Sequence, residues 1–290
     1  MKNLAYDPAD GVRFWEAIRQ LPGFPAHETM PIQAMVFESD ALFRTTEILK
    51  SVGARQDAPL VIVMDETVMQ RKQEDLKALL VSQLNGEGWQ TQTVLMRADG
   101  SGQVHTDMPH IREVQANLSP GCAVLAVGSG VVTDIAKHGC FLYEQETGET
   151  VRFVVFQTAN SVSAYTSNMS PTFVDGVKRT LDSRYPDALI CDLETLRDAP
   201  AEMTAGGVGD MLAVFISFPD WYLAHRLGMD NGYSELAKHL VGPLDEILLA
   251  HADGIRDGDL ESVAVLAKII ALGGLAMSLS HATTPMSGFE

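Results

Sequence analysis

Short apolar runs alternate with helical patterns between residues 33 and 193, and this alternation limits the chain to few folds. The runs occupy residues 33–38, 59–64, 91–96, 122–127, 153–159 and 188–193, and the run at 59–64 is rich in β-branched residues. Helical spacing of apolar residues is found between them at 68–84 and 110–118. Strands that alternate with helices form a parallel sheet covered by helices, because a parallel neighbour is reached only through a crossover. The pattern therefore predicts an α/β fold with a Rossmann-like parallel sheet.

The remaining parts of the chain have helical patterns. Residues 39–53 predict a helix, for which Ser39 or Asp40 is the expected N-cap. The last third of the sequence is rich in Ala and Leu at helical spacing and has no strand pattern. We therefore expect an α/β domain over residues 1–198 and an all-helical domain over 199–290.

Composition and charge narrow the classes of function. The formal net charge of -17 argues against a nucleic acid or an anionic membrane as the main partner. The N-terminus has no apolar signal-peptide core, and the apolar stretches are shorter than a membrane span. Eight histidines lack the spacing of a zinc helix. Reduced thiols are expected for Cys122, Cys140 and Cys191, which have no metal-like spacing. We expect a cytoplasmic protein with no nucleic-acid and no membrane partner.

A glycine turn at residues 128–130 (Gly-Ser-Gly) joins the strand at 122–127 to the next helix. Glycines let the backbone approach a diphosphate closely, and the unpaired N–H groups of a helix N-terminus hold an anion. Asp134 falls early in this helix, where a carboxylate interacts favourably with the helix dipole. The turn departs from the G-x-G-x-x-G pattern, because Val131 and Thr133 occupy its later positions. A tight turn without a ligand is the alternative interpretation.

Two further features are candidates for a ligand site at the carboxyl edge of the predicted sheet. Asp65 ends one strand, where a carboxylate accepts hydrogen bonds from ribose hydroxyls and repels a 2′-phosphate. A turn residue or a helix cap is the alternative for Asp65. Residues 157–170 follow another strand and are rich in hydroxyl groups, which suit either a polar ligand or a solvated loop.

Residues 206–212 (GGVGDML) are interpreted as a glycine-rich helix entry with Asp210 facing an apolar helix. A carboxylate among apolar side chains is costly to desolvate unless a cation or hydrogen-bond donors accompany it. A bound metal ion and an N-terminal cap each meet this need, and the spacing does not decide between them.

A set of ordered motifs within residues 59–290 resembles the sn-glycerol-1-phosphate dehydrogenases. The motifs are VGSGVVTDIAKH, TANSVSAYTS, GVKRTL, LICDLETLRDAPAEMTAGGVGDML, DWYLAHRLG and TPMSGFE. These enzymes form a superfamily with glycerol dehydrogenase, iron-containing alcohol dehydrogenases and 3-dehydroquinate synthase. The resemblance implies a dehydroquinate synthase-like fold, in which the N-terminal domain binds NAD or NADP. It also implies zinc, or another divalent metal, in the cleft beside a helical metal- and substrate-binding domain.

The resemblance assigns roles to residues position by position. Asp65 would face the adenine ribose, and Asp210 would be the catalytic, metal-ligating aspartate that also touches substrate. The other cofactor-binding positions would be Gly128, Ser129, Gly130, Val131, Asp134, Thr158, Ser161 and Ser167. The metal would polarise the substrate oxygen while hydride moves to or from the nicotinamide.

Three departures from the family pattern bear on substrate and metal. Ser163 stands where the family has a substrate-binding aspartate, and Thr284 stands where it has an arginine. Lys178 or Arg179 is the alternative source of positive charge, so Ser163 and Lys178 are the substrate-binding candidates. The sequence ends at Glu290, just before the expected first metal-binding histidine, and we expect the helical domain to be incomplete.

These observations predict a metal- and NAD(P)-dependent dehydrogenase of a small polyol or polyol phosphate, which acts on a polyol or keto substrate as a homo-oligomer. Two alternatives remain open. A nucleotide-binding homologue without catalysis is favoured by Ser163 and by the missing histidines. A cyclase of the dehydroquinate synthase kind is the other, although the GVKRTL segment is closer to the dehydrogenases.

Overall fold

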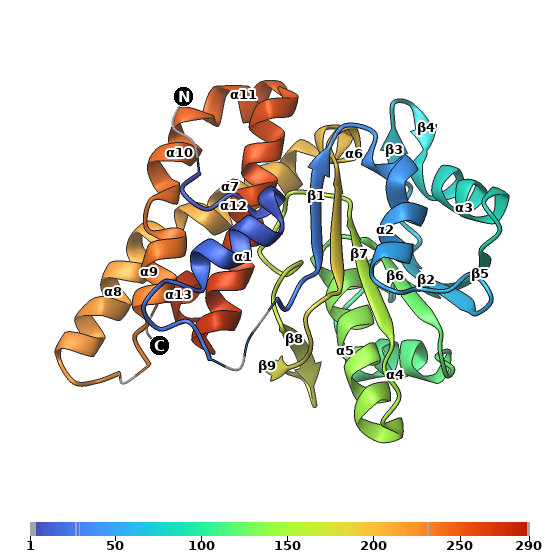
Figure 1. The fold of residues 1–290 in the computed structure, drawn as a ribbon, viewed down its shortest axis with the longest axis horizontal. Coiled ribbons are helices and arrows are strands. Elements are labelled where there is room, and N and C mark those ends of the chain that lie inside the picture. Colours follow the sequence, from blue (N-terminus) through green and yellow to red (C-terminus); the bar gives the residue numbers. More distant parts are fainter. Residues whose placement is uncertain (1–3, 27, 29, 231, 289–290) are drawn as a thin grey trace.

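A six-stranded parallel sheet forms the centre of the computed structural model, which describes residues 4–26, 28, 30–230 and 232–288 (Figure 1). Its strands are β1 (Ala34–Glu38), β10 (Ala188–Asp192), β7 (Arg152–Gln157), β6 (Ala123–Gly128), β2 (Pro59–Asp65) and β5 (Gln90–Met96), in this spatial order. All neighbouring pairs are parallel, which confirms the predicted sheet. Phe289 and Glu290, where the expected end of the helical domain falls, lie outside the described residues.

Helices cover both faces of this sheet because successive side chains of each strand point to opposite faces. On β2, Leu60 and Ile62 belong to the core shared with α2 (Thr45–Ser51) and α3 (Leu76–Gly86). Val61 and Val63 belong to the core on the other face, which is covered by α4 (Met108–Ala116) and α5 (Gly130–Thr147). Both faces are therefore buried, as the continuous apolar runs predict.

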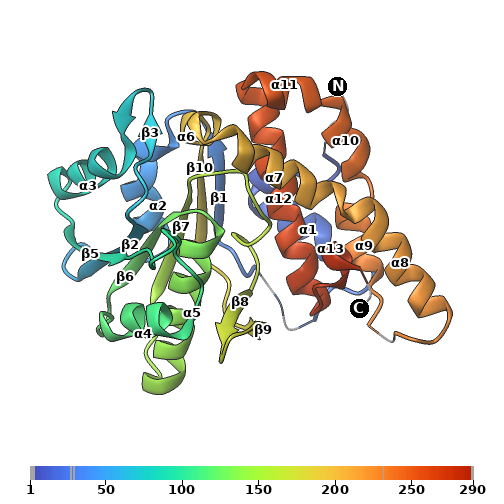
Figure 2. The same cartoon turned by 180° about the vertical axis from the view of Figure 1, so that it is seen from behind.

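The part of the molecule beside the sheet is helical, as expected for the residues after 198. After α6 (Leu193–Asp198), which directly follows β10, its elements are α7 (Ala201–Leu212), α8 (Val214–Arg226), α9 (Glu235–Val241), α10 (Leu244–Ala250), α11 (Ala252–Asp257), α12 (Leu260–Ser280) and α13 (Thr284–Ser287). Figure 2 shows these helices gathered beside the sheet. The N-terminal η1 (Pro8–Asp10) and α1 (Val12–Ile18) lie among them, and Lys268 of α12 pairs with Asp7 at 2.7 Å.

Two helical stretches are long and apolar enough to cross a membrane by length and composition, Ala201–Arg226 and Leu260–Ser280. This corrects the expectation that every apolar stretch is too short. The apolar window of Leu260–Ser280 is 78% buried, as in the core helix of a globular protein. The window of Ala201–Arg226 is only 22% buried, and the two together are weak evidence for a membrane span.

The helix predicted at 68–84 begins later than expected. A small hairpin of β3 (Gln70–Arg71) and β4 (Glu74–Asp75) comes first, and its turn places Lys72 and Gln73 at φ values of 49° and 69°. The helix α3 begins only after Asp75, whose side chain accepts a hydrogen bond from the Ala78 N–H at 2.8 Å. Asp75 therefore acts as the N-cap that sequence reasoning did not identify.

The helix predicted at 39–53 is also interrupted. It consists of the 3₁₀ turn η2 (Ala41–Arg44) followed by α2, and Asp40 stands before it in the left-handed region at φ 57°. The Asp40 side chain makes no capping hydrogen bond and instead accepts from Arg71 at 2.6 Å. Asp40 is thus the N-cap residue, as predicted, but its side chain does not cap the turn because a long-range ion pair takes the carboxylate.

Sequence analysis missed a second hairpin, formed by β8 (Met169–Val174) and β9 (Val177–Asp182). Residues 157–170 are a loop only up to its start, and the GVKRTL motif lies on β9. The hairpin projects beside α5 at the boundary between the sheet and the helical part (Figure 1).

Candidate functional site

Three adjoining cavities meet at Ser129, at the carboxyl edge of the sheet. The largest, about 690 Å³, extends from Ser129 to Asp210 and the helical part. Two others, of about 290 and 520 Å³, extend from Ser129 to Asp65. Ligands of doubly wound folds bind at this edge. The arrangement connects the predicted adenine-ribose position to the predicted substrate position through the glycine turn.

The glycine turn presents the N-terminus of α5, an 18-residue helix, to the cavities. Ser129 is its N-cap in an extended conformation, and its side chain makes no capping bond. An uncapped helix start leaves N–H groups for an anion such as a diphosphate. This site therefore fits the diphosphate of a dinucleotide.

Packing also requires the two glycines. A Cβ atom on Gly128 would lie 2.5 Å from Cβ of Val132, and one on Gly130 would lie 2.6 Å from Cγ1 of Val162. Gly130 therefore allows the loop after β7 to lie against the turn. Sequence analysis explained the glycine by the approach of a ligand or by a tight turn. It missed the contact with Val162, which lies outside the local sequence.

A buried ion pair lies next to the turn, and sequence analysis did not identify its cation. Lys137 of α5 is fully buried, and its Nζ donates to Asp134 Oδ1 at 2.9 Å. The same Nζ donates to the carbonyl oxygens of Ala164 at 2.7 Å and Met169 at 3.0 Å, and to Ser167 Oγ at 3.3 Å. Burial raises the pKa of the Asp134 carboxyl group, and Lys137 opposes that rise. The i, i+3 spacing of the pair was the signal available in the sequence.

The hydroxyl-rich loop is tightly bonded, although it lines the largest cavity. Ser161 Oγ and the Tyr165 hydroxyl are 3.0 Å apart, and Tyr165 donates to the Ala159 carbonyl at 2.7 Å. Ser167 Oγ lies 3.2 Å from the carbonyl oxygens of both Ala164 and Met169, and its one hydroxyl hydrogen is donated to this pair. Thr158 is buried and borders the 290 Å³ cavity. The loop is thus an ordered wall and not a solvated segment.

Asp210 borders the largest cavity from the helical side. It lies in the last turn of α7, so the prediction of a helix entry or an N-terminal cap was wrong. Its Oδ2 accepts a hydrogen bond from the Ser163 backbone N–H at 3.0 Å. A Cβ on Gly207 would lie 2.1 Å from the Asn160 carbonyl oxygen, so this glycine permits close packing of α7 on the loop.

Of the two predicted positive charges for a substrate, one faces the cavity and one does not. Lys178 and Thr180 of β9 border the largest cavity, because alternate residues of a strand share a face. Arg179 lies between them and does not border it. At the other end, Thr283 borders the cavity and Thr284 does not.

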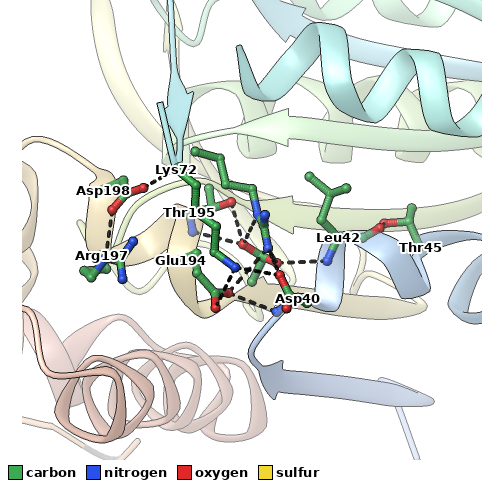
Figure 3. A network of polar contacts seen from close by, with 10 residues as sticks. Asp40, Leu42, Thr45, Lys72, Glu194, Thr195, Arg197 and Asp198 are labelled. Carbon is green, nitrogen blue, oxygen red and sulfur yellow. Dashed lines mark hydrogen bonds and ion pairs between the residues drawn. The ribbon is translucent and has the colours of Figure 1, made fainter. Parts of the chain in front are cut away.

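A polar network holds the β3–β4 hairpin against the end of β10 (Figure 3). Arg71, which is 3% exposed, donates to both carboxylate oxygens of Asp192, at 2.8 and 3.0 Å. Asp192 also accepts from the N–H groups of Leu42 and Thr195, at 3.0 and 2.9 Å. Burial alone would raise the pKa of Asp192, but these hydrogen bonds outweigh it and hold the pKa below its ordinary value. The network positions Met69 and Gln70, which border the 290 Å³ cavity.

The described residues do not form a metal site. No group of three or more His, Cys, Asp or Glu side chains within them is placed to hold a metal ion. Asp210 and Asp134 border the same cavity, but Asp134 is paired with Lys137. Zinc sites normally use three or four protein ligands. The part of the chain described here therefore supplies Asp210 without the partners that a bound metal needs.

The doubly wound sheet, the uncapped glycine turn at its carboxyl edge and the adjoining helical part define an α/β protein whose fold suits dinucleotide binding. The profile of one family, described as iron-containing alcohol dehydrogenase, matches residues 36–200. The chain belongs to this family.

Individual relatives agree with this assignment. The chain is 28% identical to a glycerol-1-phosphate dehydrogenase [NAD(P)+] of Bacillus subtilis, over 84% of this chain and 59% of the relative. It is 35% identical to that of Thermococcus kodakarensis, over 58% of this chain and 46% of the relative. The chain thus spans less than two thirds of the length of these relatives.

Solved structures show the same fold. A probable glycerol dehydrogenase from Sinorhizobium meliloti superposes with a TM-score of 0.60 at 17% identity, over 88% of this chain and 66% of that chain. An iron-containing alcohol dehydrogenase from Thermotoga maritima superposes with a TM-score of 0.63 at 14% identity, over 86% and 67%. The predicted architecture, a parallel sheet covered by helices and followed by a helical part, is therefore shared by these neighbours.

Proposed function

We propose that this chain binds NAD(H) or NADP(H) and forms part of a dehydrogenase that interconverts a small polyol, or its phosphate, with the corresponding keto compound. The observation that carries the proposal is the set of cavities around Ser129, which links Asp65 to Asp210 past the N-terminus of α5. A dinucleotide has one nucleoside on each side of a diphosphate. A central anion site with a cavity on each side fits such a ligand. The names of the relatives support the same class of cofactor and substrate.

Each end of the site has a proposed role. Asp65 accepts from the adenine ribose, and the first turn of α5 holds the diphosphate with Asp134 near the nicotinamide ribose. The complete proposed cofactor set is Asp65, Gly128, Ser129, Gly130, Val131, Asp134, Thr158, Ser161 and Ser167. Nicotinamide supplies or accepts a hydride when it is bound. We propose Ser163, Lys178 and Asp210 as the groups that contact and orient the substrate in the largest cavity.

The proposed division of labour places the boundary near residue 198, with cofactor binding before it and substrate binding after it. Metal binding by this family would need ligands in addition to Asp210, so we derive no step of the reaction through a metal. We also propose a homo-oligomeric, cytoplasmic protein. Three buried free cysteines and the exposed apolar side chains of Ile216, Leu223 and Leu227 support this proposal. Light scattering of the purified protein measures its mass.

Titration of NADH fluorescence tests the proposed function. The parent protein should bind NADH, and Gly130→Val should abolish binding because a side chain obstructs the diphosphate position. Since that side chain also collides with Val162, the paired variant Gly130→Val with Val162→Ala separates the two effects. Continued loss in the pair places the glycine in the ligand site, whereas recovery assigns it to packing. A parent that binds neither NADH nor NADPH would falsify the proposal.

A nucleotide-binding protein without catalysis is the second candidate function. It is favoured by Ser163 and by the single unaccompanied carboxylate of Asp210 within the described residues. Turnover of any small ketone by full-length protein supplied with iron or zinc and NAD(P)H would exclude this candidate.

A further inference from the structure

Lys77 lies behind the strand end that carries Asp65. It is the second residue of α3, and its side chain is 12% exposed. Its Nζ donates to Asp65 Oδ1 at 2.6 Å, to the Asp65 carbonyl at 2.7 Å and to the Thr67 carbonyl at 2.7 Å. An ammonium group has three N–H donors, so these contacts use all of them. Lys77 is therefore held in one position.

The Asp65 carboxylate has few remaining acceptor positions. Its Oδ1 also accepts from the Thr67 N–H at 3.2 Å, and its Oδ2 accepts from Thr67 Oγ1 at 3.1 Å. A carboxylate has about four lone-pair positions, so three are occupied and one on Oδ2 remains. That oxygen suffices for one ribose hydroxyl. The Lys77 ammonium cancels most of the carboxylate charge that a ligand in the neighbouring cavities would experience.

Other charges around these cavities are acidic. Asp65 and Asp198 border the 290 Å³ cavity, and Asp65 and Glu66 border the 520 Å³ cavity. Neither cavity is bordered by Lys or Arg among the described residues. Glu66 is paired with Arg97 at 3.5 Å, but that pair is largely exposed to solvent and screened. Asp198 is paired with Arg197 at 2.8 Å, which leaves Asp65 as the carboxylate that the largely buried Lys77 offsets at this end of the site.

We infer that Lys77 is the specificity-determining residue for the cofactor. A strand-end aspartate normally selects NAD(H), because its negative charge repels the 2′-phosphate of NADP(H). Here Lys77 neutralises that charge, so the site accepts both cofactors with comparable affinity. The inference rests on the proposed function and goes further by naming the group that sets the preference.

Equilibrium titration of NADH and NADPH fluorescence tests this inference on the parent chain and two variants. Lys77→Met removes the charge and the donors, whereas Lys77→Gln removes the charge and keeps N–H donors for the loop. In both variants we expect the ratio Kd(NADPH)/Kd(NADH) to rise about tenfold, because an uncompensated carboxylate then faces the 2′-phosphate. Circular dichroism melting verifies that each variant is folded. If Lys77→Met does not fold, the ratio measured for Lys77→Gln tests the inference.

Two further variants serve as controls. Lys50→Met makes the same change in net charge on an exposed position of α2 and should leave the ratio unchanged. Asp65→Asn added to Lys77→Met removes both charges and should restore the parental ratio.

A ratio that stays at the parental value in both Lys77 variants would overturn the inference, and so would a parent that prefers NADH by a hundredfold or more. Binding of neither cofactor by the parent would overturn the proposed function and the inference with it. An unchanged ratio in variants of a binding-competent parent would overturn the inference alone.

Discussion

Lys137 is a buried cation that is shielded from solvent, and its hydrogen bonds hold the loop at residues 164–169 in place. Its partners come from α5 itself and from the chain between residues 164 and 169. The ammonium thereby attaches the wall of the largest cavity to the helix whose N-terminus faces the same cavity. A buried charge is tolerated only with such complete pairing.

Lys137→Met should lower the free energy of unfolding by about 3–5 kcal/mol, because it leaves the buried Asp134 carboxylate without its partner. Urea denaturation followed by circular dichroism measures the loss. Adding Asp134→Leu should recover much of it, since an apolar pair of similar volume replaces the ion pair. Equal stability of the parent and Lys137→Met would show that the pair is not important for folding.

Asp192 makes the stability of the protein sensitive to acid. Its pKa in the folded state lies below the ordinary value of 3.8, so the unfolded chain binds a proton more readily than the folded one. The contribution of Asp192 is therefore present above pH 3.8 and is lost as the pH falls through the folded-state pKa. Asp192→Asn should destabilise the protein at pH 7, and its difference from the parent should shrink as the pH falls from about 4 to 2.

Thermal melts of the parent and Asp192→Asn over this pH range measure the effect. Asp57→Asn is the matched control, because the ion pair of Asp57 with Arg55 is exposed on both sides. A constant difference between parent and Asp192→Asn at all pH values would contradict the assigned role.

At the scale of elements, the β8–β9 hairpin decides which of two basic side chains, Lys178 or Arg179, borders the largest cavity. Strand alternation directs Lys178 toward the largest cavity and Arg179 away from it. The hairpin is bonded to the sheet domain through the Phe173 N–H, which donates to the Thr106 carbonyl at 2.7 Å. This placement makes Lys178 the candidate for a phosphate, in place of the arginine that Thr284 replaces.

We expect the full-length protein to prefer unphosphorylated ketones to dihydroxyacetone phosphate, because Ser163 and Thr284 replace charged residues of the family pattern. The remaining turnover of dihydroxyacetone phosphate should depend on Lys178. In Lys178→Met, kcat/KM for this substrate should fall about a hundredfold, whereas dihydroxyacetone should be affected little. Arg179→Met is the control. Steady-state kinetics that show efficient dihydroxyacetone phosphate turnover in Lys178→Met would refute the assignment.

At the scale of the whole molecule, segments distant in the sequence pack together and jointly line the largest cavity. The first helix packs with the C-terminal helices, and Trp15 Nε1 donates to the Ile32 carbonyl at 3.0 Å beside them. The largest cavity takes Ser129 and Lys178 from the α/β part and Asp210 from the helical part. The residues proposed to bind substrate and cofactor therefore meet only when both parts are folded.

The composition of that cavity predicts little bound metal in the chain of 290 residues. Asp210 lacks partners with metal-binding side chains among the described residues, and one carboxylate holds a divalent ion weakly. Elemental analysis of protein purified with added zinc or iron should find far less than one ion per chain. One tightly held ion per chain would mean that further ligands had been overlooked.

Much of the architecture could be predicted from local sequence. The six strands, the glycine turn at 128–130 and the helical last third follow from patterns within a few residues, because strand and helix periodicities are properties of neighbouring side chains. The start of α3 and the β8–β9 hairpin could not be predicted in this way. Over a short stretch of sequence, the turns and caps that form there cannot be distinguished from the helical pattern at 68–84 or the loop pattern at 157–170.

The contacts that shape the site depend on residues far apart in the chain. Arg71 reaches Asp192 across 121 residues, and Ser163 reaches Asp210 across 47. No spacing rule links such pairs, because their distance is set by how the sheet and helices pack. The sequence therefore identifies Asp65 and Asp210 as candidates. Only the tertiary structure decides that Lys77 neutralises the first and that the second stands without further metal ligands among the described residues.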